Sequence, residues 1–213
     1  MSTEENKFDY INIAKRVLDI ESSAISELKS NLGKSFTDAC ELCINCKGKI
    51  IVMGLGKSGH IADKIAATFA STGTPAFFIH PSEAIHGDLG IITADDLVLM
   101  LSNSGETQEL SDLICYTRRN KIFTISITSC ATSTLVKASD LALILPKTTE
   151  ACSLGLAPTT STTAMLALGD ALAVSVMKVR KFTKDGFRKF HPGGKHGARL
   201  LQVKDLMHSG SKL

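Results

Sequence analysis

The chain can be interpreted outward from an apolar run that ends in a hydroxyl-rich turn, Leu97-Val98-Leu99-Met100-Leu101-Ser102-Asn103-Ser104-Gly105-Glu106-Thr107. Consecutive apolar residues predict a strand that is buried on both faces, as in a parallel sheet. The residues after the turn, 108–119, have the periodicity of a helix. The stretch therefore predicts a strand–turn–helix unit of an α/β fold, with polar side chains where the helix begins.

The turn has the composition of a phosphate-binding site. Ser102, Ser104 and Thr107 offer hydroxyl donors, and Gly105 allows the backbone to approach a ligand closely. The free N–H groups and the positive dipole end of a helix N-terminus attract anions. An ordinary N-cap needs only one such hydroxyl. The excess of hydroxyl groups therefore favours a phosphate site over a simple cap.

Similar apolar runs recur along the chain and alternate with helical segments. The five runs are Lys49–Met53, Ala76–Ile79, Leu97–Leu101, Ile122–Ile127 and Leu141–Leu145. Alternating strands and helices favour a parallel sheet with right-handed crossovers. We therefore expect an α/β fold in which a five-stranded parallel sheet is flanked by helices.

Long helices are expected on both sides of these strands. Before the first strand, apolar residues recur every three to four positions, at Ile13, Val17, Ile20, Ala24, Leu28 and Leu32. After the last strand, an apolar helix opens near Pro158 and extends to Val179. Asp170 and the hydroxyl-rich start of this segment favour a buried core helix over a membrane span. One sheet cannot cover both helices, so we expect the protein to self-associate.

Length and composition indicate one globular domain. We expect helices in residues 1–48 to pack on a core at 49–207, with 208–213 as a tail. A net charge of +3 is too small to indicate a nucleic-acid partner. The polar N-terminus does not resemble a signal peptide. The six cysteines then indicate a reducing compartment, so a cytoplasmic location is expected.

Three of the cysteines, Cys40, Cys43 and Cys46, have the C-x2-C-x2-C spacing of some metal or cluster sites. They also fall on one broad face of a predicted helix, and no fourth ligand lies near them in the sequence. Buried cysteine behaves as a small hydrophobic residue. We therefore expect core packing at these positions and no metal.

The glycine-rich segment Gly54–Gly59 follows the first strand and opens a helix. It matches the G-x-G-x-x-G pattern of dinucleotide-binding turns, but the second strand is followed by His80 and not by the acid that would hold a ribose. A Walker loop would need glycine at position 51, where the chain has Ile51. The turn still places Lys57 and Ser58 at the carboxyl edge of the sheet, where ligands bind in such folds.

Further polar residues follow the strand ends. His86 lies in the loop after the second strand, Glu109 follows the phosphate turn, and Glu150 follows the fifth strand. His191 lies in another polar segment near the C-terminus. A single histidine is more often structural than catalytic, and no HExxH-like zinc spacing is present. The convergence of Lys57, His86, Glu109 and Glu150 on one edge is therefore the stronger indication of a catalytic site.

Together these segments resemble arabinose-5-phosphate isomerases, a family of sugar isomerase (SIS) domain proteins. The matching motifs are, in order, G-x-G-K-S-G, H-P-x-E-A-x-H-G-D-L-G, S-N-S-G-E-T, E-A-x-S-x-G-L-A-P-T-x-S and F-H-P-G-G-x-x-G. They span about residues 50–207. Many family members continue beyond residues 203–207 into a pair of CBS regulatory modules. Because this chain stops there, we expect either a short form or an excised catalytic domain.

The resemblance implies an SIS-type three-layer sandwich and interconversion of D-ribulose 5-phosphate and D-arabinose 5-phosphate, which feeds synthesis of the Kdo sugar of lipopolysaccharide or capsule. It also implies a homotetramer whose active sites combine residues of neighbouring subunits. The implied catalytic positions are Lys57, Glu109, Glu150, His191 and His86. The implied phosphate ligands are Ser102, Asn103, Ser104 and Thr107, with Ser58 at the adjoining turn.

Aldose–ketose isomerisation moves a proton between adjacent carbons through a cis-enediol, and it requires neither metal nor nicotinamide. We expect Glu150 to move the carbon proton, His191 or His86 to move protons between the oxygens, and Lys57 to offset the charge of the enediolate. Glu109 is the alternative base.

Other functions stay open at this point. The alternatives are isomerisation of another phosphosugar, a non-catalytic sugar-phosphate sensor, and a dinucleotide-dependent oxidoreductase that rests on the glycine-rich turn alone.

Overall fold

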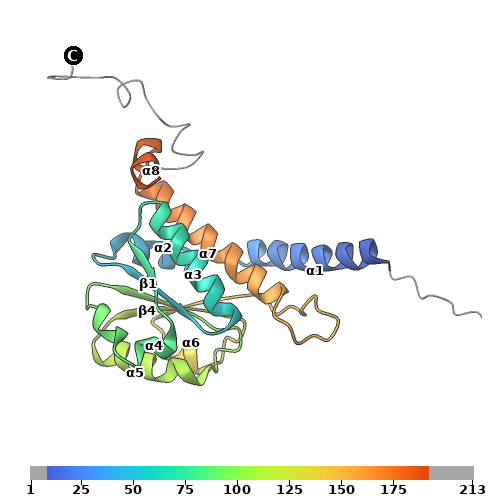
Figure 1. The fold of residues 1–213 in the computed structure, drawn as a ribbon, viewed down its shortest axis with the longest axis horizontal. Helices are drawn as coiled ribbons and strands as arrows, with labels where there is room; N and C mark the ends of the chain where they lie inside the picture. Colours follow the sequence, from blue (N-terminus) through green and yellow to red (C-terminus); the bar gives the residue numbers. More distant parts are fainter. Residues whose placement is uncertain (1–8, 192–213) are drawn as a thin grey trace, which may run out of the picture.

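The computed structural model describes residues 9–191 and contains one parallel sheet of five strands in the order β2-β1-β3-β4-β5 (Figure 1). All five apolar runs form strands, as expected. Their bounds are β1 (Ile50–Gly54), β2 (Ala76–Phe78), β3 (Leu97–Leu101), β4 (Phe123–Thr128) and β5 (Leu141–Ile144). Each pair of neighbouring strands is parallel. The carboxyl ends of all the strands therefore lie along one edge of the sheet.

Helices cover both faces of this sheet. Figure 1 shows α2, α3 and α7 on one side and α4, α5 and α6 on the other. The bounds are α1 (Tyr10–Ser30), α2 (Lys34–Asn45), α3 (Lys57–Ser71), α4 (Pro81–Ala84), α5 (Ser111–Arg119), α6 (Thr134–Ala138), α7 (Thr160–Val179) and α8 (Lys184–Phe190), with 3-10 turns η1 (Asp88–Ile91) and η2 (Gln108–Leu110). The expected helix over 108–119 is thus divided into η2 and α5.

The strand side chains alternate between two separate apolar cores. Leu97 and Leu99 of β3 face a core shared with α2, α3 and α7, whereas Val98 and Met100 face a core shared with α4, α5 and α6. Because successive side chains of a strand point to opposite faces, both faces of β3 must be apolar. Helices thus cover both faces of the sheet, as the uninterrupted apolar runs predict, and the result is the three-layer sandwich that the family resemblance implies.

The helices α3 and α7 lie side by side and run in the same direction. Ile65 of α3 contacts α7 at Gly169, where a Cβ atom would overlap its side chain, and Lys64 forms an ion pair with Asp170 at 2.6 Å. Beyond the C-terminal ends of both helices, the ring of Phe182 packs against Gly73. The two N-termini consequently lie level with each other at the carboxyl edge of the sheet.

Within the described part of the chain, α7 is long and apolar enough to cross a membrane, by length and composition alone. Its buried residues include Met165, Leu168 and Leu172, which belong to the core beside the sheet. It also packs against α1, α2 and α3. The ion pair of Asp170 with Lys64 accounts for the charge within this apolar helix. The structure therefore agrees with a core helix.

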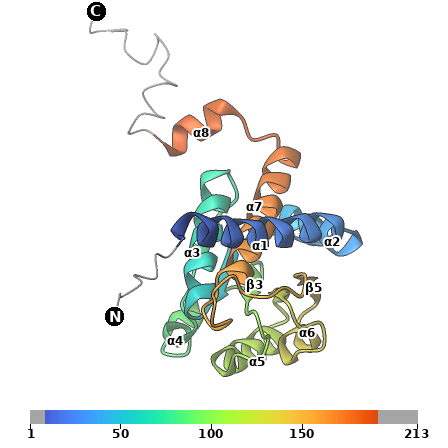
Figure 2. The same cartoon turned by 90° about the vertical axis from the view of Figure 1, so that its right-hand side faces the viewer.

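The first helix, α1, extends far beyond the sheet and crosses α7 (Figures 1 and 2). Only Ala24 and Leu28 are buried along it. The expected helical segment included Leu32, but α1 ends at Ser30. A short break then precedes α2, because Gly33 takes an extended conformation as the N-cap of α2.

The three clustered cysteines pack into the core. Cys43 on α2 is buried, and burial raises the pKa of its thiol to about 12. Cys40 and Cys46 are partly buried against the same core, and burial also raises the pKa of each. Among residues 9–191, no group of His, Cys, Asp and Glu side chains is arranged to hold a metal ion. The core-packing interpretation of the cysteine motif fits this arrangement.

Candidate active site

The turn after β3, residues 102–107, is a compact loop that we call the phosphate loop. The hydroxyl of Ser102 lies 2.7 Å from that of Thr107 and also accepts a hydrogen bond from the Gly105 N–H at 3.0 Å. Gly105 has φ +68°, and a Cβ atom there would overlap Ser133. Only glycine fits this position, because the conformation is left-handed and the neighbouring segment is in contact.

The end of β4 holds the outer side of the phosphate loop. The carbonyl of Asn103 accepts hydrogen bonds from the Thr128 hydroxyl at 3.0 Å, the Ser129 hydroxyl at 2.8 Å and the Ser129 N–H at 3.1 Å. The side chains of Asn103 and Ser104 are exposed at the rim. The loop is thus fixed by its backbone to the end of β4, while its side chains at the rim are open to solvent, as a ligand-binding turn requires.

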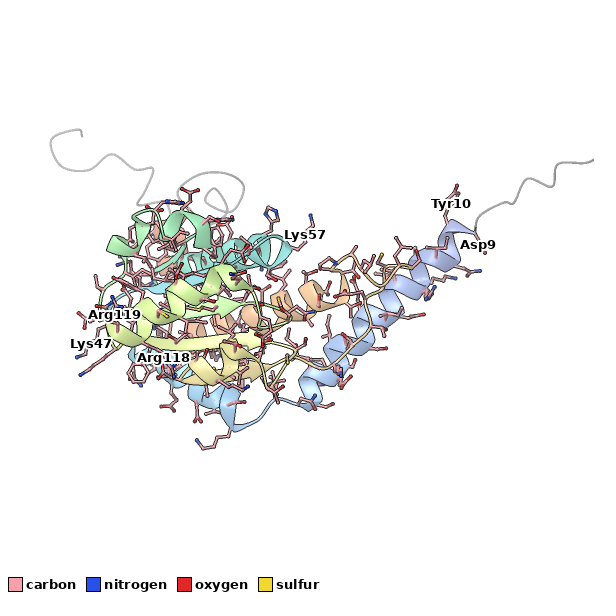
Figure 3. The ribbon with its side chains drawn as sticks, turned by 90° about the horizontal axis from the view of Figure 1, so that it is seen from below. Asp9, Tyr10, Lys47, Lys57, Arg118 and Arg119 are labelled. Atoms are coloured by element: carbon pink, nitrogen blue, oxygen red, sulfur yellow. The ribbon has the colours of Figure 1, made fainter. Side chains whose placement is uncertain are left out.

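The glycine-rich turn adjoins the phosphate loop. Gly54 at the end of β1 is in register with Leu101 at the end of β3. Gly56, with φ +57°, then caps α3, so that Lys57 and Ser58 form the first residues of that helix. Lys57 is exposed, and Figure 3 shows it on the side of the molecule from which α1 extends. A lysine and a helix N-terminus therefore lie beside the predicted phosphate site, and both favour an anion.

Glu150 is bound to the N-terminus of α7. Its Oε2 accepts hydrogen bonds from the Thr159 N–H at 2.7 Å, the Thr159 hydroxyl at 3.1 Å and the Ser161 N–H at 3.3 Å. Its Oε1 accepts one from the Ser161 hydroxyl. Burial acts to raise the pKa of Glu150, but the hydrogen bonds from Ser161 and Thr159 together hold that pKa below its usual value. The carboxylate is therefore ionised at neutral pH and fixed in orientation.

Lys57 and Glu150 share one edge of the sheet because α3 and α7 are parallel. Ile65 and Gly169, which are in contact, each lie about 12–14 Å from the start of their helix. Packed helices are separated by roughly 8–10 Å. The start of α3, with Lys57, and the capped start of α7, with Glu150, are therefore neighbours, although the residues are far apart in sequence.

An open cavity of about 450 Å³ lies between α1 and residues 147–149, the segment that directly precedes Glu150 in the chain. Its lining residues are Asp19, Ile20, Ser23, Ala24, Glu27, Lys147, Thr148 and Thr149. The long N-terminal helix thus faces the segment that leads into Glu150, and sequence periodicity does not indicate this contact.

Two further candidates lie at the same edge. His86 is exposed between α4 and η1, beyond the end of β2, which pairs with β1. Glu109 is exposed in η2, directly after the phosphate loop. The structure therefore brings Lys57, His86, Glu109 and Glu150 to the carboxyl edge, as expected.

His191 does not join this group within one chain. It follows α8, where its ring stacks on Phe187 with the ring centres 3.8 Å apart and its Nδ1 lies 2.8 Å from the Phe187 carbonyl. The 20 residues of α7 span about 30 Å, and α8 lies beyond their far end (Figure 1). His191 is therefore near the opposite edge of the sheet from Lys57 of its own chain.

Sequence patterns do not identify the residues that hold these candidates in place. Thr159 and Ser161 fix Glu150, whereas Thr128 and Ser129 fix the phosphate loop. The hydroxyl-rich start of α7 is a usable signal, since such residues gather at helix N-termini. The end of β4 carries no comparable signal, because its hydroxyl residues act on a segment that is distant in sequence.

Comparison with known proteins agrees with this arrangement. The SIS domain family model matches residues 43–175. The arabinose 5-phosphate isomerase KdsD of Yersinia pestis is 52% identical over 206 residues, which is 96% of this chain and 63% of the relative. The protein of the same name from Pseudomonas aeruginosa is 49% identical over 214 residues, or 100% of this chain and 65% of the relative. The chain thus spans a little under two thirds of the length of these relatives.

A solved structure supports the same assignment. The Escherichia coli CFT073 protein c3406, in complex with arabinose 5-phosphate, has a TM-score of 0.84 and 41% sequence identity. The match covers 88% of this chain and 100% of that one. The region that the family model matches contains the whole sheet and the phosphate loop, and the chain belongs to the SIS domain family.

Proposed function

We propose that this protein is an aldose–ketose isomerase that interconverts D-ribulose 5-phosphate and D-arabinose 5-phosphate. The observation that carries the proposal is the placement of a hydroxyl-rich phosphate loop beside Lys57 and an anchored Glu150 at one sheet edge. The relatives described above bear the name of this activity, and one related structure holds arabinose 5-phosphate. The phosphosugar is thus the substrate class that fits both the site and the family.

The phosphate loop would bind the phosphate and so place the sugar chain along the carboxyl edge. Ser104 and Asn103 at the rim, with Ser102 and Thr107 beneath them, supply the polar donors. Ser58 lies at the start of the adjoining helix. An anion held there would lie near the positive end of α3, which offsets part of its charge.

Glu150 is suited to the transfer of the carbon proton. It would take the proton from C2 of the aldose to form the cis-enediol and return it to C1, which gives the ketose. Its Oε1 accepts one hydrogen bond, whereas its Oε2 accepts three, so Oε1 keeps more free acceptor capacity for the substrate. Glu109 is the alternative base, since it is exposed directly beside the phosphate loop.

The remaining proton moves from one oxygen to the next, and the intermediate carries negative charge. Lys57 would stabilise the enediolate oxygen as a preorganised positive charge. His86 lies at the same edge and would relay the oxygen proton. His191 would serve the site of a neighbouring copy, because it is remote from Lys57 in its own chain.

The subunit arrangement and cellular role are parts of this proposal. A homotetramer with shared sites would explain both the remote His191 and the apolar residues exposed along α1, such as Ile11 and Leu18. We infer a cytoplasmic enzyme with one core domain on which the N-terminal helices pack. Its product, arabinose 5-phosphate, would feed Kdo synthesis for lipopolysaccharide or capsule.

The test is incubation of chelator-treated protein with D-ribulose 5-phosphate in deuterated water, followed by NMR. Arabinose 5-phosphate with deuterium at C2 is expected, because the enediol proton exchanges with solvent. Unlabelled product would retain the isomerase but indicate a shielded base. Binding without conversion would contradict the proposal and favour a sensor, and conversion of a different phosphosugar would reassign the substrate.

Glu150→Gln should lose at least about a hundredfold in turnover, as removal of a general base does. Glu41→Gln, on the exposed side of α2, should keep the wild-type turnover.

A further inference from the structure

The phosphate loop is fixed on a second side by α6. The Thr134 N–H, in the first turn of α6, donates to Oε1 of Glu106 at 2.8 Å. The next N–H, of Leu135, donates to the Gly105 carbonyl at 3.1 Å. Two consecutive loop residues, one by its side chain and one by its backbone, are thus bound to the start of the same helix. The Thr134 N–H also lowers the pKa of Glu106, so the group is a carboxylate at neutral pH.

These bonds determine which way the loop's N–H groups point. In a planar trans peptide the carbonyl and the following N–H point in opposite directions. The Asn103 carbonyl is held by the end of β4 and the Gly105 carbonyl by α6. The N–H groups of Ser104 and Glu106 therefore face the inner side of the loop, where the Glu106 N–H meets the Ser104 hydroxyl at 3.2 Å.

On the α6 side, Gly105 packs closely against Ser133, whereas the region beside Glu106 is open. A cavity of about 310 Å³ adjoins the loop there, and it is lined by Gly105, Glu106, Thr107, Gln108, Leu110, Ser111, Ile114, Thr134 and Leu135. The hydrogen bond from Thr134 to Glu106 lies at the border of this cavity. An acidic side chain within a phosphate site would otherwise be unfavourable, because like charges repel. The hydrogen bond from the Thr134 N–H instead uses this carboxylate to attach the loop to α6.

We propose that Glu106 is a positioning residue: by accepting the Thr134 N–H it holds the phosphate loop in the conformation that binds the substrate phosphate. The inference rests on the proposed function for the identity of the substrate, but it concerns the binding of phosphate and not the proton transfer. The acceptor oxygen of Glu106 is what matters, and its negative charge is not required.

The experiment compares wild type with Glu106→Ala, Glu106→Gln and Thr134→Pro. KM and kcat are measured with D-arabinose 5-phosphate, and Kd with inorganic phosphate by calorimetry. Glu106→Ala should raise KM and the phosphate Kd about tenfold while kcat changes less than about threefold, since binding common to ground and transition states is lost. Glu106→Gln should stay within about twofold of wild type, because its amide oxygen can still accept the bond.

Thr134→Pro removes the donor of the same hydrogen bond. Proline is well tolerated at the first position of a helix, and Ser133 before it has the extended conformation, ψ 161°, that proline requires. This variant should match Glu106→Ala, and the double variant Glu106→Ala/Thr134→Pro should be no worse than either. Glu41→Ala is the control, because Glu41 is exposed on α2. Thermal unfolding of every variant establishes that it is folded.

The possible outcomes distinguish this role from the proposed function. The inference is overturned if Glu106→Ala or Thr134→Pro leaves the phosphate Kd unchanged. It is also overturned if Glu106→Gln raises the phosphate Kd as much as Glu106→Ala does, or if kcat falls while KM and the phosphate Kd stay the same. Because phosphate binding needs no turnover, a wild-type protein that binds phosphate without isomerising the sugar phosphate would refute the proposed function and still test Glu106. A wild-type protein that binds neither phosphate nor sugar phosphate would refute both.

Discussion

Glu150 combines two roles in one side chain, as a cap of α7 and as the proposed base. Its carboxylate satisfies backbone N–H groups at the start of α7, which is the role of a helix cap, and it is also the proposed base. A carboxylate with several donors is ionised but only weakly basic. A shift of the Ser161 hydroxyl away from Oε1 as substrate binds would make this oxygen more basic, and rotation of the hydroxyl group would suffice for it.

The lowered pKa of Glu150 predicts a pH dependence of stability. Its pKa is lower in the folded protein than the value of 4.5 expected when unfolded, so the stabilisation is present above about pH 4.5 and is lost as pH falls through the folded pKa. Glu150→Gln should cost about 0.5–1 kcal/mol at pH 7, a modest value because the group is partly exposed. The difference in Tm between the two proteins should shrink below pH 4.5.

Calorimetry from about pH 3.5 to 8 measures this difference, with Glu41→Gln as the matched control on the exposed side of α2. A gap between wild type and Glu150→Gln that stays constant down to the lowest pH would contradict the assignment of the lowered pKa to Glu150.

The pair of helices α3 and α7 aligns the two halves of the site. Each helix starts at the carboxyl edge, and their contact at Ile65 and Gly169 keeps the starts level. Periodicity predicts both helices but not their contact, since the two positions lie far apart in the sequence. By its residue type Gly169 interrupts an apolar helix, but in the structure it allows the close approach of a neighbouring helix.

Gly169→Ala should therefore destabilise the protein although alanine is the better helix former. The new methyl group would overlap the Ile65 side chain, and overpacking costs about 1–3 kcal/mol. The gain in helix propensity is at most about 1 kcal/mol. Adding Ile65→Val should relieve part of the overlap, so the double variant should be more stable than the sum of the single effects predicts. Urea unfolding of the four proteins measures this coupling, and strictly additive effects would refute the close contact.

The whole molecule has an exposed arm that a single chain leaves uncovered. The face of α1 near Ala24 and Leu28 contacts the body of the protein, whereas Ile11, Leu18 and Ile25 recur at seven-residue spacing and are exposed. Figure 3 shows the start of this arm, at Asp9 and Tyr10, far from the basic side chains of Lys47, Arg118 and Arg119. An apolar stripe of this length is typical of a surface that pairs with another helix.

Leu18→Glu should weaken the proposed self-association, because Leu18 is 64% exposed in the single chain and lies on the stripe that would face a second copy. Light scattering after size exclusion measures the mass, and the fraction of lower-mass species should rise at micromolar concentration. Activity should fall with it if His191 serves a neighbouring site. Ser26→Glu adds the same charge outside the stripe and is the control. A Leu18→Glu protein with wild-type mass and activity would exclude this surface.

The sequence by itself determined the strands, the order of layers and the position of the phosphate loop. These features depend on local patterns: uninterrupted apolar runs such as Leu97–Leu101, and hydroxyl residues gathered around a glycine directly after such a run. Most of the residues proposed for catalysis could also be placed at one edge, since parallel strands bring their carboxyl ends together.

Only the tertiary structure decided how these residues are held and which of them meet. The capping of α7 by Glu150, the bond from Thr134 to Glu106 and the contact of Ile65 with Gly169 join segments that are separated in sequence, so no local pattern specifies them. The remote position of His191 follows from the length and direction of α7, which places the end of the described chain at the opposite edge. Local chemistry determines the elements, whereas packing between distant elements determines the geometry of the site.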